Sequence, residues 1–253
     1  MAVFRTLLTI TMALVFCTQA HADPKKVEAK VAKDFSAIAT ALRKTYPEIP
    51  VDAVSKTDMD GIFEVLSDGH VFYYHQQSGS VITGEILRGT RNITAARRDE
   101  ITAIMVRALP LEKAVKTGAG KSIVIEFSDP DCPYCRQADA FLSKRDDITW
   151  YVFMFPLSMH KDAEKKSLKI LCSANMSAEY RGAMEGKLDT AFSLPAGCEA
   201  KAAPILKESI AWGKKLGVMG TPALWVNGKR VNGADIATIQ SLLDVAQKEK
   251  AGN

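Results

Sequence analysis

Apolar positions in the first third of the chain change from a helical to a strand-like spacing. Over residues 26–46 they recur every three or four positions, which places them on one face of a helix that ends at Pro47. Over residues 61–88, the short β-rich runs IFEVL, VFYYH and SVITGEIL are separated by glycine-containing turns, as in the hairpins of an antiparallel sheet. Such a thin sheet buries little core by itself. We therefore expect it to pack against its own helix and against a second copy of the chain.

A second helix is predicted from Thr94, as its N-cap, to about Leu109. Its apolar positions form one narrow stripe, Ile101, Ile104, Met105 and Ala108. A helix of about 15 residues is about 22 Å long, enough to hold two domains apart. The same pattern fits a helix that simply packs on the next domain, and the sequence leaves both possibilities open.

The remainder of the chain alternates strands and helices. The predicted order is a buried strand at 122–127, a helix that begins within DPDCPYCRQ, a strand in TWYVFMFPL, a Lys-rich helical stretch at 162–184, a helix at about 204–216, the hairpin TPALWVNGKRV, and a C-terminal helix at 236–248. This is the order of a thioredoxin-type α/β layer. We predict an α+β N-terminal domain joined by a linker helix to an α/β thioredoxin-fold domain with a helical insert.

The extreme N-terminus has the layout of a secretory signal peptide. One positive charge at Arg5 precedes an apolar run over residues 7–17, and small residues stand at Ala20 and Ala22. The apolar run is shorter than the ~20 residues that a membrane-spanning helix needs. The predicted divisions are a signal peptide at 1–22, an N-terminal dimerisation domain at 23–92, a linker helix and hinge at 93–120, and a thioredoxin-fold domain at 121–253.

Composition and charge set limits on function. Removal of residues 1–22 would leave four cysteines in an exported chain, where disulfide chemistry is permitted. The formal net charge is +4, and lysines alternate with acidic residues along most of the chain. This pattern is typical of an ordinary solvated surface and does not indicate a nucleic-acid partner.

The segment FSDPDCPYCRQ carries the candidate chemistry, because it contains the closely spaced pair Cys132 and Cys135. A zinc site would need two further ligands, usually another closely spaced pair. Neither Cys172 nor Cys198 has a second ligand beside it, so we predict no metal. A purely structural bridge between Cys132 and Cys135 would close so small a loop that it would constrain the unfolded chain little.

A reactive dithiol explains this segment best. Cys132 stands where a strand ends and a helix begins, so unpaired backbone N–H groups and the helix dipole favour its thiolate. In such motifs the cysteine pKa falls from ~8.5 to ~3.5–7. Cys135, one turn further into the helix, is placed to resolve a mixed disulfide. Pro133 in the first turn costs no hydrogen bond and fixes the start of the helix.

Three further features accompany the dithiol. Pro222, after Thr221, precedes an apolar strand, and either a cis bond or an ordinary trans loop proline would satisfy that position. Glu126 lies in an otherwise apolar strand, where it would exchange protons with Cys135 if buried, or reach water at the strand end. Cys172 and Cys198 flank the helical insert, and a bridge between them would contribute roughly 3 to 4 kcal/mol through loop closure.

With these motifs in place, the chain resembles the periplasmic disulfide isomerases of the DsbC and DsbG family. The resemblance runs from about Pro47 to the C-terminal part of the chain. It rests on FSDPDCPYC, on HKDAEKKSLKILC, on the second cysteine at 198, and on KLGVMGTPALWVNG.

The resemblance implies a V-shaped periplasmic homodimer, joined through its N-terminal domains, with an apolar cleft that holds misfolded exported proteins. It implies that Cys132 attacks a wrong disulfide in the client and that Cys135 releases it. Thr221 and a cis Pro222 would line the peptide site together with the motif residues Pro133 and Tyr134, and Cys172 with Cys198 would be structural. It also implies a membrane reductase of the DsbD type as electron donor, some chaperone activity, and no cofactor.

Three departures from the family pattern leave the direction of the reaction open. Pro133 resembles DsbG, because DsbC has Gly-Tyr between its cysteines. Glu126 resembles the acid of DsbA and thioredoxin, where the isomerases have an apolar residue. The helix at 26–46 is longer than the N-terminal segment of the family. A DsbA-like oxidase or reductase, and a non-catalytic holdase with a closed Cys132–Cys135 bridge, are therefore the alternatives to an isomerase.

Overall fold

The computed structural model describes residues 36–251. The predicted signal peptide at 1–22 and the first ten positions of the helix predicted at 26–46 lie outside the described residues. The described part of that helix is α2 (Ser36–Thr45), and Tyr46 donates its backbone N–H to the Leu42 carbonyl at its end.

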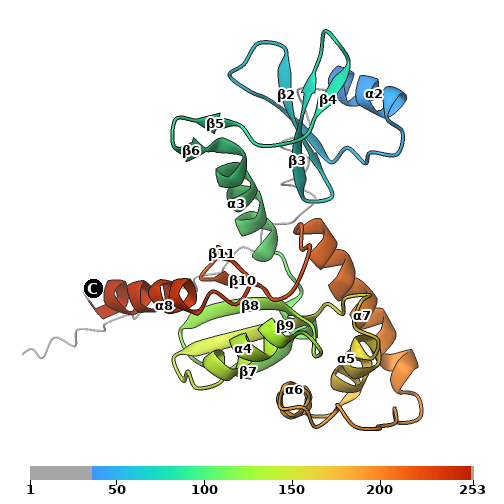
Figure 1. The fold of residues 1–253 in the computed structure, drawn as a ribbon, viewed down its shortest axis with the longest axis vertical. Coiled ribbons are helices and arrows are strands. Elements are labelled where there is room, and N and C mark those ends of the chain that lie inside the picture. Colours follow the sequence, from blue (N-terminus) through green and yellow to red (C-terminus); the bar gives the residue numbers. More distant parts are fainter. Residues whose placement is uncertain (1–35, 252–253) are drawn as a thin grey trace, which may run out of the picture.

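An antiparallel sheet of four strands follows α2 (Figure 1). The strands β1 (Ala53–Lys56), β2 (Ile62–Ser67), β3 (His70–His75) and β4 (Ser80–Ile82) are adjacent in chain order. The core between sheet and helix consists of Ile38, Leu42, Val54, Val65, Phe72 and Tyr74. The prediction missed β1. It also made the last strand too long, because only the first three residues of SVITGEIL pair with β3.

The helix predicted from Thr94 is α3 (Ile93–Val106), which follows the two-residue strands β5 (Leu87–Arg88) and β6 (Arg91–Asn92). The predicted cap was wrong, and the predicted stripe was right only in part, because Met105 packs against the second core whereas Ile104 does not. Asn92 is the N-cap and accepts from the Ala95 N–H, whereas Thr94 is buried against the Tyr73 hydroxyl of β3. Thr94, Thr102 and Val106 are the buried side chains of α3, while Ile104 is 45% exposed.

A mixed sheet of five strands forms the second domain. Its strands are β7 (Val115–Gly118), β8 (Ser122–Ser128), β9 (Ile148–Met154), β10 (Ala223–Val226) and β11 (Lys229–Asn232), in the order β11-β10-β8-β9-β7. Only the β8–β9 pair is parallel. A short 3-10 turn, Leu111–Lys113, leads into β7. The prediction placed 115–118 in the hinge, whereas the structure pairs it with β9 at the edge of the sheet.

Helices cover both faces of this sheet (Figure 1). They are α4 (Pro133–Leu142), α5 (Ala163–Cys172), α6 (Met176–Met184), α7 (Cys198–Lys215) and α8 (Ile236–Ala251). The helical stretch predicted at 162–184 is thus two helices, because Asn175 caps α6 by accepting from the Ala178 N–H. The helix predicted from 204 begins at Cys198 and contains Pro204.

The two faces have separate cores. The face under α4, α5 and α8 is built on residues such as Val124, Leu142, Trp150, Ile170, Leu224 and Leu243. The opposite face packs Ile125, Phe127, Phe153 and Trp225 against the ends of α3 and α7. Because side chains alternate along a strand, consecutive residues of β8 contribute to different cores.

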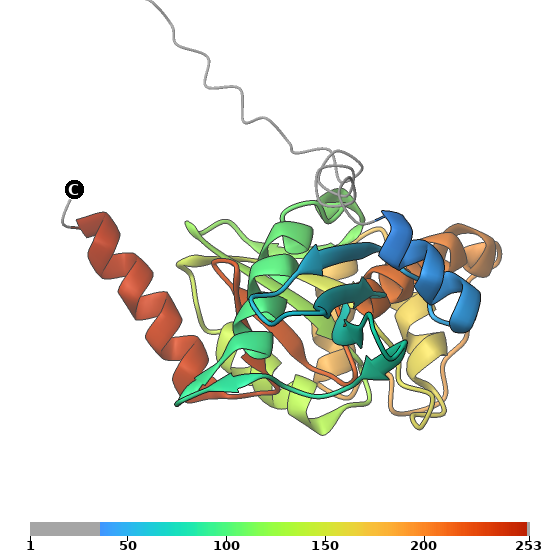
Figure 2. The same ribbon diagram turned by 90° about the horizontal axis from the view of Figure 1, so that it is seen from above.

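The two sheets are joined by more than the linker helix. The C-terminal end of α3 contributes Val106 to the core of the second domain, and the N-terminal half of α3 contacts β3 of the first domain. The helix therefore packs on both domains as well as linking them. The tight turn at Gly69 (φ +77°) lies against the end of α7, where a Cβ on this glycine would stand 1.8 Å from the Lys215 carbonyl oxygen. Figure 2 shows α8 extending away from the other helices.

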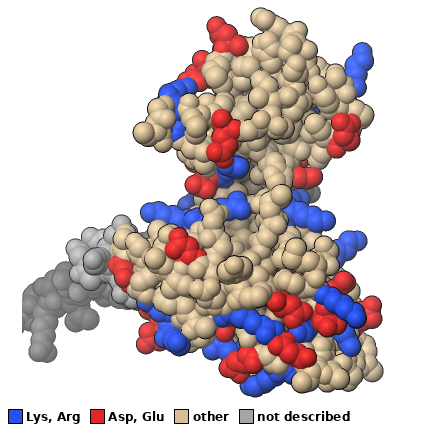
Figure 3. Space-filling view, viewed as in Figure 1, with Lys and Arg blue, Asp and Glu red and all other residues tan. Residues whose placement is uncertain are grey.

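In Figure 3 basic and acidic side chains are intermixed over the thioredoxin-like domain. No helix within residues 36–251 is long and apolar enough to cross a membrane.

Candidate active site

A buried aspartate organises the loop between β8 and α4. Asp129 is fully buried, and its carboxylate accepts from the backbone N–H groups of Asp131 and Leu157, each at 2.7 Å. His160 Nδ1 lies 2.9 Å from the same carboxylate. These contacts tie the loop before the dithiol to the segment that follows β9.

Cys132 is the N-cap of α4 and Pro133 is its first residue, as the sequence predicts. The Cys132 Sγ lies 3.2 Å from the Thr221 carbonyl oxygen. Hydrogen bonding to the Cys135 thiol is the largest influence on Cys132. Together with the Thr221 side chain and the first backbone N–H groups of α4, it lowers the pKa of Cys132 to about 5, against the opposing effect of burial. At neutral pH Cys132 is therefore mostly thiolate.

Cys135 has the opposite character. Its side chain is fully buried, and its Sγ accepts from the Asp129 N–H at 3.4 Å. Burial, the neighbouring Cys132 and the charge of Glu126 all raise the pKa of Cys135 far above its ordinary value. The pKa values of the two thiols are thus shifted in opposite directions, which favours the thiolate at Cys132 and the protonated thiol at Cys135.

Glu126 lies on the α4 side of β8 and is fully buried. Neither carboxylate oxygen has a hydrogen-bond partner among the described residues. Burial raises the pKa of Glu126 to about 8, although Ser128 and Trp150 lie close enough to moderate the increase. Of the two arrangements that the sequence left open, the structure has the buried one.

The Thr221–Pro222 bond is cis, and the Thr221 carbonyl faces Cys132. Three large apolar side chains are exposed on the segments that surround Cys132: Tyr134 at 64%, Met159 at 79% and Met219 at 84%. Met159 and Met219 were not among the predicted site residues. Their segments are joined to the dithiol loop by the contacts of His160 with Asp129 and of Thr221 with Cys132, which bring together loops that are distant in the sequence.

The other cysteine pair lies outside this site. Cys172 at the end of α5 and Cys198 at the start of α7 form a disulfide, with Cα atoms 5.3 Å apart. Cys132 and Cys135 are free thiols. The structure therefore separates the four cysteines into one bonded pair and one reactive pair.

Besides Asp129, a further buried acid was missed from the sequence. Asp139 is 5% exposed and lies on α4 one turn beyond Cys135. Burial raises the pKa of Asp139 to about 6, and its carboxylate lies 3.6 Å from Arg181 Nε on α6. The spacing of four residues from Cys135 placed Asp139 on the same helix face, which was the available signal.

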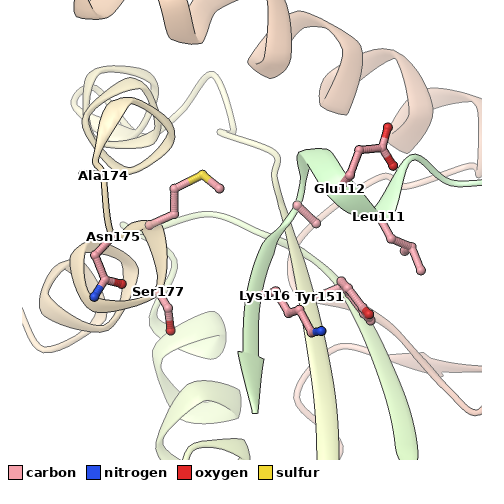
Figure 4. A pocket seen from close by; sticks show the side chains of 9 residues that line it. Leu111, Glu112, Lys116, Tyr151, Ala174, Asn175 and Ser177 are labelled. Carbon is pink, nitrogen blue, oxygen red and sulfur yellow. The ribbon is translucent and has the colours of Figure 1, made fainter. Parts of the chain in front are cut away.

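Within residues 36–251 no group of three or more His, Cys, Asp or Glu side chains could hold a metal ion. An open cavity of about 550 Å³ lies between the β7–β9 edge and the start of α6, where Lys116, Tyr151 and Asn175 line it (Figure 4). Neither free thiol contributes to its lining. The chemistry of the thiols is thus separate from this cavity.

Comparison with known proteins identifies the family. The family model described as the disulfide bond isomerase protein N-terminal domain matches residues 18–95, and the thioredoxin-like domain matches residues 109–246. A probable thiol:disulfide interchange protein DsbC of Bordetella avium is 32% identical over 197 residues, which are 74% of this chain and 68% of that protein. The chain belongs to the DsbC family. It is a thiol:disulfide oxidoreductase with a thioredoxin-like domain.

Other similarities agree at the sequence level. The probable DsbC of Bordetella pertussis is 29% identical over 204 residues, covering 78% of this chain and 70% of that protein. A solved disulfide interchange protein from Neisseria gonorrhoeae is 29% identical and matches 54% of this chain and 96% of its own, with a TM-score of 0.46. Membership of the DsbC family rests on the sequence matches.

Proposed function

We propose that this DsbC-family protein is a periplasmic disulfide isomerase that reshuffles non-native disulfides in exported proteins through Cys132 and Cys135. One observation carries the assignment of roles. Both side chains are buried, with Cys132 4% exposed and Cys135 fully buried, but the pKa of Cys132 is lowered to about 5 and that of Cys135 is raised far above the ordinary value. In such a pair Cys132 is the nucleophilic thiolate, and Cys135 stays protonated until it attacks the mixed disulfide.

The first step is attack by the Cys132 thiolate on one sulfur of a client disulfide. A mixed disulfide forms between Cys132 and the client, and the second client sulfur leaves as a thiolate. That thiolate can attack another client disulfide, and a client thiolate finally displaces Cys132. The client then has a new pairing, and neither client nor enzyme has gained or lost electrons.

When the mixed disulfide does not rearrange, Cys135 resolves it and releases the client. It loses its proton and attacks the Cys132 sulfur, and the client leaves as a thiolate. The client is reduced by two electrons, and the Cys132–Cys135 pair is oxidised to a disulfide. Glu126 is the proposed proton carrier for Cys135 in the fraction of molecules in which its carboxyl, with a pKa of about 8, is ionised, because the carboxylate interacts electrostatically with Cys135 and has no competing hydrogen bond among the described residues. The oxidised pair would need a reductant, for which we propose a membrane reductase of the DsbD type.

Clients would bind beside Cys132 rather than in the cavity of Figure 4. We assign Pro133, Tyr134, Thr221 and Pro222 to this surface. The exposed side chains of Tyr134 and Met219 support the assignment, because apolar surface next to the thiolate suits unfolded polypeptide.

We also propose a homodimer joined through residues 23–92, with chaperone activity in the space between its thioredoxin-like domains. The match of the N-terminal family model supports this assembly. Residues 1–22 would direct the chain to the periplasm, and Cys172–Cys198 would be a structural bridge.

An oxidase or reductase is the second candidate. Glu126 favours it, since a buried acid beside Cys135 assists proton transfer in either direction. A monomeric protein would favour it further. A holdase with a permanently closed Cys132–Cys135 bridge is the third candidate, and it predicts that the dithiol is dispensable.

The test is reactivation of scrambled ribonuclease in a glutathione buffer by the mature protein, with Cys132→Ser and Cys135→Ser variants beside it. The mass of each sample in solution is measured by light scattering. The isomerase proposal predicts reactivation by a dimer, its loss in Cys132→Ser, and partial activity in Cys135→Ser. No reactivation by the unmodified protein, or equal activity in Cys132→Ser, would overturn it.

A further inference from the structure

A nearly buried lysine connects the helical insert to the active-site loop. Lys166 on α5 is only 4% exposed. Its Nζ binds the carboxylate of Asp131, the residue before Cys132, and lies 2.6 Å from Asp189 Oδ1. In the sequence the stretch at 162–184 is simply Lys-rich and polar, so neither the burial of Lys166 nor its partners were expected.

Arg136 completes the cluster from the other side of the dithiol. It follows Cys135 on α4 and donates to both carboxylate oxygens of Asp189, each at 2.7 Å. Its Nε and Nη2 also donate to the Pro130 carbonyl oxygen at 3.0 and 2.9 Å. Arg136 Nη2 lies 3.6 Å from Asp131 Oδ1.

The cluster is electrically balanced, with two cations and two carboxylates. Burial acts to lower the pKa of Lys166, but its hydrogen bonds to Asp131 and Asp189 raise it above the ordinary value. The hydrogen bonds from Arg136 and Lys166 hold the pKa of Asp189 well below its usual range. Lys166 is the buried member of this cluster, and a buried charge that loses its partner is costly.

The cluster involves residues on both sides of the Cys132–Cys135 segment. Asp131 and Pro130 precede Cys132, and Arg136 follows Cys135, whereas Lys166 and Asp189 belong to the insert. The titratable and charged groups around this segment are Asp129, Asp131, Arg136, Lys166, Asp189, Glu126 and His160. Among these carboxylates, Asp131 is the one whose residue immediately precedes Cys132 in the chain.

From this geometry we propose that Lys166 is a positioning residue of the DsbC-type reaction. With Arg136 it fixes the Pro130–Asp131 segment and neutralises the carboxylate beside Cys132. The insert thereby supports the attacking thiolate without contacting the client. This inference rests on the proposed role of Cys132 as nucleophile.

The test measures the pKa of Cys132 from the pH dependence of its alkylation by iodoacetamide, with the modified peptide identified by mass spectrometry. Lys166→Met leaves the Asp131 carboxylate without its lysine, so we expect the Cys132 pKa to rise by about half a unit. Asp131→Asn removes the carboxylate and should lower it. The double variant should return to within about 0.2 units of the unmodified protein, because neither charge remains. Lys166→Arg should rescue the single variant in part.

Lys165→Met is the matched control. This neighbouring lysine of α5 is exposed and binds the Phe192 carbonyl, so its loss should leave the Cys132 pKa unchanged. A Lys166→Met variant with an unshifted Cys132 pKa contradicts the inference, as does a double variant that stays as high as the single one. If Lys166→Met does not fold, the Asp131→Asn variant is the test. An unchanged or raised Cys132 pKa in that variant contradicts the inference. An ordinary Cys132 pKa in the unmodified protein would instead refute the proposed nucleophile.

Discussion

Replacing Glu126 by glutamine should make the thioredoxin-like domain more stable, and increasingly so as the pH rises. Glu126 is fully buried without a hydrogen-bond partner among the described residues, and burial raises its pKa from an ordinary 4.5 to about 8. Glutamine keeps the shape and never needs to ionise. The variant thus isolates the free energy of keeping this carboxyl buried.

Proton linkage gives the direction in which the free energy of unfolding changes with pH. Below pH 4.5 the carboxyl is protonated in both the folded and the unfolded chain, and the pH-dependent difference is absent. Between 4.5 and about 8 only the unfolded chain ionises, so the free energy of unfolding falls with rising pH. Within this range each pH unit lowers the free energy of unfolding by about 1.4 kcal/mol. At pH 7, which lies about 2.5 units above the ordinary pKa of 4.5, the free energy of unfolding is therefore lower by about 3 kcal/mol.

Urea unfolding followed by tryptophan fluorescence between pH 4.5 and 8.5 measures this loss. All three tryptophans, Trp150, Trp212 and Trp225, belong to the thioredoxin-like domain, so the signal reports on that domain. A Cys132→Ser, Cys135→Ser background removes thiol titration and oxidation from both proteins. Glu164→Gln, on the exposed side of α5, is the control and should change stability nearly equally at all pH values. Stability curves of the Glu126→Gln protein and its parent that stay parallel across this range would refute the reasoning.

Three further predictions concern other parts of the molecule. Replacing both Cys172 and Cys198 by alanine should cost about 3 to 4 kcal/mol in urea unfolding, since the bridge closes a loop of 26 residues, and a loss below about 1 kcal/mol would contradict a structural role. Gly69→Ala should separate the β2–β3 turn from α7 and speed proteolysis between the domains. Gly79→Ala should not, because its φ is similar and a Cβ there would come no closer than 3.8 Å to another atom, the Tyr74 hydroxyl. Asp139→Asn should remove a loss of stability that develops between pH 3.8 and about 6, and a pH dependence like that of the unmodified protein would show that Asp139 stays ionised when folded.

The dithiol and its surroundings could be predicted because their signals are local. A strand that ends shortly before Cys-Pro-Tyr-Cys fixes Cys132 at a helix N-terminus, and the order of elements indicates the thioredoxin layer. Glu126 could be named but not placed, because its burial depends on how α4 and α6 cover the sheet. The capping prediction at Thr94 failed because the neighbouring Asn92 competes for the same role, and packing against β3 decides between them.

The features that were missed depend on contacts between distant segments. β7 contains glycine and polar residues, and it is a strand because β9 offers it an edge. Lys166 resembles every other lysine of a solvated helix until Asp131 and Asp189 are brought to it by the fold. Sequence periodicity carries no information on such pairings, which is why the support of the active-site loop became visible only in the structure.

The most direct test of the central claim is to trap the mixed disulfide. The mature Cys135→Ser protein is mixed with scrambled ribonuclease, quenched with acid, and analysed by non-reducing electrophoresis and mass spectrometry. Cys132 as attacking thiolate and Cys135 as resolving thiol predict a covalent adduct linked through Cys132, which is short-lived in the unmodified protein and absent from Cys132→Ser. An adduct through any other cysteine, or no adduct while reactivation proceeds, would contradict this account.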